Sequence, residues 1–241
     1  MQLSKKLLAL SLALIMMVAF SVNGFSATFV DVPDNSPYKE AISSMVSLGL
    51  LVGYEDGSFR PNDTITRAEF AAVITRALGM ESIAASASSA DIFSDMTTNG
   101  VNHWATGYVR IAYDKNIILG MGDGTFAPDA PITYEQAVKM IVCTLGREMA
   151  ANDKGGWPNG YIAEANDIGL TQNAVISPTS SPAPRGLVAQ LVFNSLEIQL
   201  MERSTGGSMV QVNKTLLKDM LKVTKYNNYM VTEVDGALGT A

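Results

Sequence analysis

The residue whose type and position most clearly suggest chemistry is an arginine at the start of an expected helix. Thr66 and Glu69 have the spacing of a capping box, so Arg67 is predicted to be the first helical residue. Exposed N–H groups at this end favour an anion, and a cation gains nothing from the helix dipole. A bound carboxylate would explain the arginine, because the two groups pair in bidentate fashion. The alternatives are a solvent-exposed arginine and a structural bond to a neighbouring loop.

Other groups that could do chemistry are few. The chain has one histidine, His103, and one cysteine, Cys143, which cannot build a disulfide framework or a Cys/His zinc site. The pairs Asp56-Gly57 and Asp123-Gly124 resemble fragments of calcium loops, but the alternating ligands and the closing glutamate are missing. We therefore predict no catalytic residue, no cofactor and no metal.

The composition favours a folded, acidic protein. Among 241 residues, 17 are Lys or Arg and 23 are Asp or Glu, which gives a net charge of -6. Hydrophobic residues make up 47% and charged residues only 17%, unlike a disordered chain. The acidic balance, without any basic block, argues against nucleic-acid binding.

The N-terminus has the layout of a secretory signal. Lys5 and Lys6 precede an apolar run from Leu7 to Val22, which is short for a membrane span. We assign residues 1–27 to a signal peptide, with an uncleaved anchor as the alternative. The protein is then expected to be exported, and not held in a membrane after cleavage.

Internal repeats determine the organisation of the rest of the chain. The segment Gly53–Pro61 returns as Gly120–Pro128, an offset of 67 residues, and the match continues to Gly79 and Gly146. A third, degenerate copy has Trp157 in the position of the Trp104 of copy two. In the position of Arg67, copy two has Tyr134 and copy three has Arg185.

Each copy is predicted to form a helix, a loop and a second helix. In the second helix of copy one, apolar residues from Phe70 to Leu78 follow the spacing of a buried stripe. One such helix pair cannot bury its apolar face alone, so the copies are expected to pack around a shared centre. The stretches Ser82–Ala90 and Asn152–Gly156 are predicted linkers.

These patterns divide the chain into five parts. After Met201, residues Lys214–Lys225 are predicted to form a short amphipathic helix and Tyr229–Val234 a strand, and this tail is either frayed or the start of a further domain. The expected parts are a signal peptide (1–27), copy one (28–80), copy two (91–147), copy three (156–201) and a tail or further domain (202–241).

The motifs of the copies resemble the S-layer homology (SLH) repeat. Copy one has the motif Phe29–Val32, the loop Gly53–Pro61 and the helix start Ile65–Phe70. Copy two matches in the loop but departs at Tyr134, and copy three loses the loop together with the capping threonine and glutamate. The resemblance covers roughly residues 29 to 201.

The resemblance implies a fold and a function. The implied fold is mainly α: three helix-loop-helix SLH repeats form a pseudo-threefold prism around a central three-helix bundle. The implied function is non-covalent anchoring of an exported protein to the cell wall of a Gram-positive-type envelope. The partner would be a secondary cell wall polymer linked to peptidoglycan, a pyruvylated amino-sugar glycan held in grooves between repeats.

The expected ligand-binding residues occupy matching places in the copies. Arg67 and Arg185 would pair with a pyruvyl carboxylate, while Tyr134 would leave a weaker groove or stack on a sugar ring. Trp104 and Trp157 are either core or rim anchors or sugar contacts. The remaining expected positions, each with a structural alternative, are Asp31 and Asp95 (polymer hydroxyls or helix caps) and Gly53, Gly57, Gly120 and Gly124 (close approach of a sugar or positive φ).

Two other classes of function remain open at this stage. A structural subunit that assembles laterally into a surface array would use the same repeats as a scaffold. A wall-active glycoside hydrolase would need two carboxylates at a set separation across a cleft. Most acidic residues here are accounted for by loops and caps, so a non-enzymatic anchor is preferred.

Overall fold

The computed structural model describes residues 28–87, 92–226 and 229–232. The expected signal segment and the end of the tail, from residue 233, lie outside the described residues. The described part is mainly helical, as expected, and none of its helices is long and apolar enough to cross a bilayer. In chain order its elements are α2 (Lys39–Ser47), α3 (Arg67–Ala77), α4 (Glu81–Ser86), η1 (Ser94–Met96), β1 (Thr97–Thr98), β2 (Val101–Asn102), α5 (Thr106–Asp114), α6 (Tyr134–Thr144), α7 (Glu148–Asp153), α8 (Asn159–Asp167), α9 (Arg185–Ser195), β3 (Met201–Arg203), β4 (Met209–Gln211), η2 (Leu216–Met220), β5 (Val223–Tyr226) and β6 (Tyr229–Thr232).

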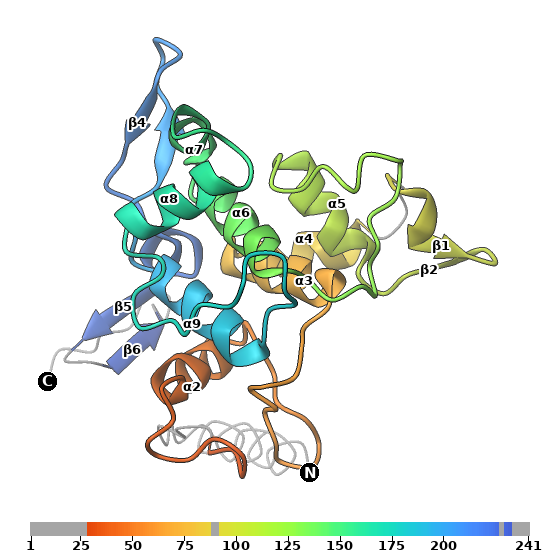
Figure 1. Cartoon of the computed structure of the whole chain (residues 1–241), viewed down its shortest axis with the longest axis vertical. Helices are drawn as coiled ribbons and strands as arrows, with labels where there is room; N and C mark the ends of the chain where they lie inside the picture. The colour runs from red at the N-terminus through yellow and green to blue at the C-terminus, as the bar shows by residue number, and fades with distance from the viewer. Residues whose placement is uncertain (1–27, 88–91, 227–228, 233–241) are drawn as a thin grey trace, which may run out of the picture.

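Three helices of equal length form the middle of the described fold. Helices α3, α6 and α9 begin at Arg67, Tyr134 and Arg185, the three positions that the repeats align. They meet near the middle of Figure 1, while α2, α5 and α8 lie on three different sides of them. Helix α5 packs on α3, α8 on α6 and α2 on α9. In chain order each copy contains two helices joined by a loop, α2 and α3, α5 and α6, or α8 and α9, and the first helix of each copy packs on the second helix of another copy.

Local sequence signals fix the ends of these helices. The predicted capping box of Thr66 with Glu69 is formed, and Thr133 with Gln136 forms the equivalent box in copy two. Helix α9, in the degenerate copy three, starts after Pro184 without a side-chain cap. Gly79 and Gly146 follow α3 and α6 with φ of 68° and 73°, the left-handed conformation expected of helix-ending glycines.

The helix starts also connect the copies to one another. The first backbone N–H of each central helix donates to a carbonyl in another copy, and the three bonds are Arg67 to Ala130 (2.9 Å), Tyr134 to Ser181 (3.0 Å) and Arg185 to Asp63 (2.8 Å). Copy one thus contacts copy two, copy two contacts copy three, and copy three contacts copy one. Because Ala68 N–H also donates to the carbonyl of Pro128, the expectation of exposed N–H groups at the start of α3 was wrong.

Both predicted linkers contain helix that the sequence interpretation missed. Helix α4 occupies much of the described part of Ser82–Ala90, and α7 extends to Asp153. Each packs against the following helix at a glycine. A Cβ on Gly107 would lie 1.9 Å from the carbonyl oxygen of Ala84, and one on Gly160 would lie 2.1 Å from that of Ala151. Both glycines are therefore required for the close approach of a short helix.

The segment after copy three packs on the same core. Leu216, Leu217 and Val223 are buried in the main hydrophobic cluster. The predicted helix at Lys214–Lys225 is instead the π-helix η2 followed by strand β5. The predicted strand is present as β6, and its antiparallel partner β5 precedes it in the chain. The described part of this segment is thus attached to the three copies by buried side chains.

Candidate functional site

Two aspartates fix the equivalent loops of copies one and two. The Asp31 carboxylate accepts hydrogen bonds from the amides of Phe59 (2.8 Å) and Arg60 (2.7 Å). Asp95 accepts the same pair of bonds from the amides of Phe126 (2.8 Å) and Ala127 (2.7 Å). The expectation that the two aspartates cap the first helices was wrong, because the N-cap residues of α2 and α5 are Tyr38 and Ala105.

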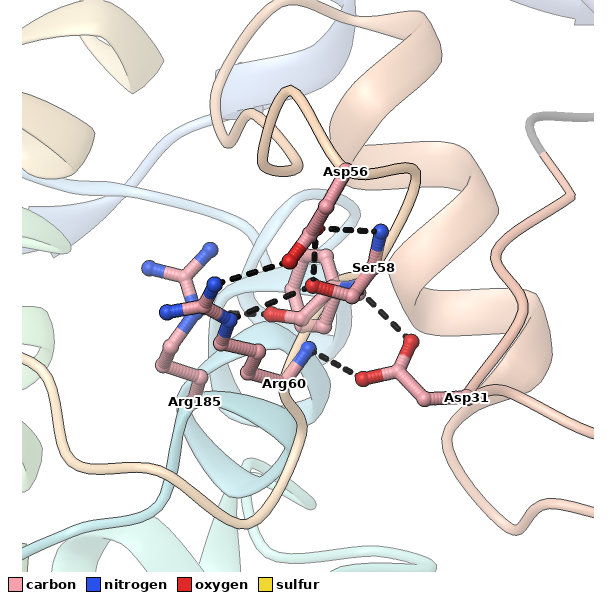
Figure 2. A network of polar contacts seen from close by, with 6 residues as sticks. Asp31, Asp56, Ser58, Arg60 and Arg185 are labelled. Carbon is pink, nitrogen blue, oxygen red and sulfur yellow. Dashed lines mark hydrogen bonds and ion pairs between the residues drawn. The ribbon is translucent and has the colours of Figure 1, made fainter.

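Two arginines hold the opposite edge of the same loops. Arg185 Nε donates to the carbonyl of Phe59 at 3.0 Å, and Arg67 Nε donates to the carbonyl of Phe126 at 2.8 Å. Figure 2 shows Asp31 and Arg185 on opposite sides of the first loop. Each arginine belongs to a different copy from the loop that it contacts. The structural bond to a neighbouring loop, one of the alternatives for Arg67, is therefore present for both arginines.

A second nitrogen of each arginine also donates a hydrogen bond. Arg185 Nη2 donates to the carbonyl of Val52 at 2.8 Å, and Arg67 Nη1 donates to Gln136 Oε1 at 2.9 Å. The residues are only 5% and 7% exposed, respectively. Burial lowers the pKa of Arg67, although the charge of Asp95 opposes that shift. The guanidinium remains protonated because its usual pKa is so high.

Each loop carries a tight turn closed by a further aspartate. Asp56 accepts hydrogen bonds from the hydroxyl (2.6 Å) and amide (3.0 Å) of Ser58 and pairs with Arg60 at 2.9 Å. Asp123 accepts the same two bonds from Thr125. The Asp-Gly pairs that resembled calcium loops thus serve turns, and the described residues contain no cluster of three potential metal ligands.

The four expected loop glycines differ in what they permit. Gly57, Gly120 and Gly124 have φ of 78°, 77° and 87°, so they need the left-handed conformation. Gly53 has no positive φ, and the conformational reason offered for it was wrong. A Cβ on Gly53 would lie 2.2 Å from Cε1 of Phe29, so this glycine permits close packing.

Two grooves of matching construction lie beside the buried arginines. The first, here called the Arg185 groove, has a volume of about 240 Å³ and is lined by residues that include Val52, Glu69, Arg76, Trp104 and Arg185. The second, the Arg67 groove, has a volume of about 280 Å³, and its lining includes Leu119, Gln136, Lys139, Trp157 and Arg67. In each groove, one copy supplies the arginine, another the loop and central helix, and the remaining copy the tryptophan.

The tryptophans are positioned at the edges of the grooves. Trp104 is 56% exposed and Trp157 is 47% exposed, so neither is a core anchor. Each packs edge to face against the tyrosine one turn later, Tyr108 or Tyr161, with centroids 6.1 and 6.2 Å apart. A half-exposed indole with its other side supported is suited to contact with a sugar ring.

Tyr134 does not line either groove. Its residue is 1% exposed, and burial raises the pKa of its hydroxyl. The expectation that it stacks on a sugar ring therefore has no exposed ring surface to support it. The Tyr134 amide donates to the carbonyl of Ser181 in copy three, the same helix-start bond that Arg67 and Arg185 make to Ala130 and Asp63.

The sequence interpretation missed several groove residues. Lys139, Arg76, Gln136 and Val52 line the grooves but were not singled out. The available signal was a difference between aligned copies: Lys139 of copy two aligns with Ala72 of copy one, beside the apolar stripe. Because charged residues are rarely buried, a lysine in place of the alanine of copy one indicates open space next to this position.

The contacts of the single histidine and the single cysteine indicate structural roles. His103 Nε2 lies 3.2 Å from Asp129 Oδ1, and its Nδ1 accepts the Ala105 amide. Burial, with a contribution from Glu148, raises the pKa of the Cys143 thiol to about 12. The thiol is therefore protonated at neutral pH, which makes it a poor nucleophile.

The described fold and its grooves define a helical repeat module that presents cations and aromatic rings between its copies. The S-layer homology domain model matches residues 28–71 and 100–138, which fall in copies one and two. The chain is an S-layer homology domain protein.

Curated relatives agree with this family. The chain is 34% identical over 189 residues to the middle cell wall protein of Brevibacillus brevis, covering 77% of this chain and 17% of that protein. It is 32% identical over 199 residues to the surface layer protein of Brevibacillus choshinensis, covering 83% and 17%. It is 33% identical over 189 residues to the cellulosome-anchoring protein of Acetivibrio thermocellus, covering 78% and 37%. The chain thus spans only a minor part of the length of each relative.

Proposed function

We propose that this protein anchors a polypeptide to the outside of the cell by binding a cell wall glycan in the Arg67 and Arg185 grooves. The names of the relatives, a cell wall protein, a surface layer protein and an anchoring protein, support a cell-surface location. The observation that carries the proposal is the repeated groove. Each one combines a buried arginine, a loop held from both sides and a half-exposed tryptophan.

The chemistry of the grooves favours an anionic sugar. A guanidinium whose Nε is already bonded to a loop carbonyl has a fixed orientation, so little further order is lost when a carboxylate binds its outer edge. The neighbouring indole offers a flat apolar surface to the ring that carries the carboxylate. A pyruvylated amino sugar of a secondary cell wall polymer has both features, and it is the ligand we propose.

The third interface between copies lacks every part of this arrangement. Copy three has no loop of this type, Tyr134 stands in place of the arginine, and Pro37 occupies the position of the tryptophan. These losses concern three different copies, yet all fall on one interface. We therefore propose a pseudo-threefold prism with a central three-helix bundle, of which two grooves bind. Two weak grooves on one polymer add through effective concentration.

Co-sedimentation with purified walls tests the proposal. The full chain is mixed with walls that keep their secondary polymer and with walls stripped of it by acid. We expect pelleting with the intact walls only. Equal pelleting with both would contradict polymer binding, and concentration-dependent sheets without walls would indicate lateral assembly instead.

Variants of the exposed tryptophans separate binding from folding. Trp104→Ala and Trp157→Ala should each weaken pelleting, and the double variant should abolish it, because the sugar loses its aromatic contact. Neither indole makes a hydrogen bond within the described residues, so the variants should still fold. Tyr113→Ala is the matched control, since this partly exposed aromatic lies outside both grooves. If the control weakens pelleting as much as the tryptophan variants, the grooves are not the binding sites.

A further inference from the structure

The two grooves are alike in construction but differ in charge. The Arg185 groove is lined by Arg185, Arg76 and Glu69. Its Arg76 already pairs with Glu81, with Nε 2.9 Å from Oε1. The Arg67 groove is lined by Arg67 and Lys139, and the residue aligned with Glu69 is the neutral Gln136. The lining of the Arg67 groove therefore carries two positive charges and no negative one.

Lys139 is positioned beside the other binding elements of its groove. It lies three residues after Gln136 on α6, so the two side chains share a face, and Gln136 Oε1 accepts from Arg67 Nη1. The Lys139 Nζ lies 5.3 Å from the ring centroid of Trp157 and 5.6 Å from that of Tyr161. Cation–π contact thus holds the ammonium against the aromatic edge of the groove.

No carboxylate neutralises this ammonium among the described residues. The ion pairs of that part of the chain do not include Lys139. Two acidic residues on neighbouring positions are Glu135, one turn earlier on α6, and Glu148 on α7, which accepts a hydrogen bond from the Tyr161 hydroxyl at 3.3 Å. Neither lines the groove.

We propose that Lys139 makes the Arg67 groove specific for a ligand segment with two negative charges, one on Arg67 and one on Lys139. The Arg185 groove then takes a segment with one charge, because Ala72 stands where Lys139 stands and Arg76 is already paired. The second charge is a carboxylate or a phosphate on a neighbouring sugar. This inference rests on the proposed polymer binding and assigns the two grooves to differently charged parts of the same glycan.

The chain offers a separate optical reporter for each groove. It contains two tryptophans, one at each groove. In Trp104→Phe the remaining fluorescence reports the Arg67 groove, and in Trp157→Phe it reports the Arg185 groove. The probe is the polymer released from walls by acid and cut into fragments too short to bridge both grooves, so that each tryptophan reports its own groove. The fragments are titrated at low and high salt. A second sample, with its carboxylates amidated by carbodiimide coupling, loses the charge on Arg67 in either case. An effect of Lys139→Gln that persists with this sample identifies the second anion as a phosphate, and one that disappears identifies it as a carboxylate.

In the Trp104→Phe protein, adding Lys139→Gln should weaken polymer binding about fivefold and reduce its salt dependence, as expected for one partly exposed charge pair. Lys139→Arg should restore both. In the Trp157→Phe protein, Lys139→Gln should change nothing. Unchanged affinity at Trp157, or equal weakening at both tryptophans, would overturn the assignment while leaving polymer binding intact. A wild-type protein that neither pellets with walls nor responds to polymer would overturn the proposed function itself.

Discussion

The amide of Phe59 donates to the Asp31 carboxylate at 2.8 Å, while the carbonyl of Phe59 accepts from Arg185 at 3.0 Å. One residue of the loop is thus held from both sides by parts of the chain that are distant in sequence. The next residue, Arg60, has φ of 58°, a strained conformation for a residue other than glycine. Its amide bonds to the same carboxylate, so Asp31 offsets the strain where it arises.

Removing the Asp31 carboxylate should destabilise the protein. Asp31→Ala deletes two charge-assisted hydrogen bonds and leaves the Phe59 amide without its acceptor, which costs about 2–3 kcal/mol. The free energy of unfolding in urea measures the loss. Asp34→Ala is the control, because the Asp34 side chain is 97% exposed and its ion pair with Lys39 lies at the surface, so the urea midpoint should change little. An Asp31→Ala protein as stable as the control would contradict the role assigned to this carboxylate.

The turn closed by Asp56 should respond to acid. Hydrogen bonds from the Ser58 hydroxyl and amide, and then from Arg60, lower the pKa of Asp56 to about 2. Since the unfolded value is about 3.9, the stabilisation is complete above the unfolded value and is lost as pH falls from about 4 towards 2. Carboxyl NMR titration measures the Asp56 midpoint directly.

Ser58→Ala provides the matched test of the cause. Without the hydroxyl that makes the largest contribution, the Asp56 midpoint should rise towards 4. The midpoint of Asp123, which is lowered by the equivalent bonds from Thr125, should remain unchanged in the same protein. A wild-type midpoint near 4 for Asp56 would show that these bonds are not formed in solution.

Features set by nearby residues could be predicted from the sequence. The capping boxes at Thr66 and Thr133 and the helix-ending Gly79 and Gly146 involve partners within a few residues, so spacing alone identifies them. The repeat offset likewise located Arg67 and Arg185 at equivalent helix starts. The half-exposed tryptophans follow from the same alignment, although their degree of exposure does not.

Features set by distant partners could not be predicted. Arg67 contacts the carbonyl of Phe126, 59 residues away, and no local pattern distinguishes this bond from a free arginine. Helix α4 has six residues, too short for a periodic pattern, and depends on Gly107 for its place. The sequence marks Lys139 only as a departure from Ala72 of copy one, and its position in a groove beside Trp157 of the next copy depends on the fold.

The segment after copy three should be needed for stability. Leu216 is 1% exposed and belongs to the main core, so Leu216→Ala should lower the free energy of unfolding by about 2–5 kcal/mol. Val210→Ala, in the exposed strand β4, is the control and should have little effect. Equal stability of the Leu216→Ala and wild-type proteins would mean that this segment folds independently of the three copies.

The glycines under the short helices should be intolerant of any side chain. In Gly107→Ala the new Cβ would lie 1.9 Å from the backbone oxygen of Ala84, so α4 or α5 must shift, at a cost of about 1–3 kcal/mol. Gly160→Ala should behave in the same way towards α7. Gly206→Ala, whose nearest contact is a side-chain oxygen at 3.8 Å, is the control.

Hydrogen exchange of the backbone amides shows which helix the new Cβ displaces. If α4 is held on α5 only by this approach, Gly107→Ala should release the amides of Ala84 and Ala87, which bond within and just after α4, before those of α3. Exchange that rises equally throughout the protein would indicate that α4 is part of the cooperative core. Exchange unchanged at Ala84 would show that α4 does not pack against Gly107 in solution.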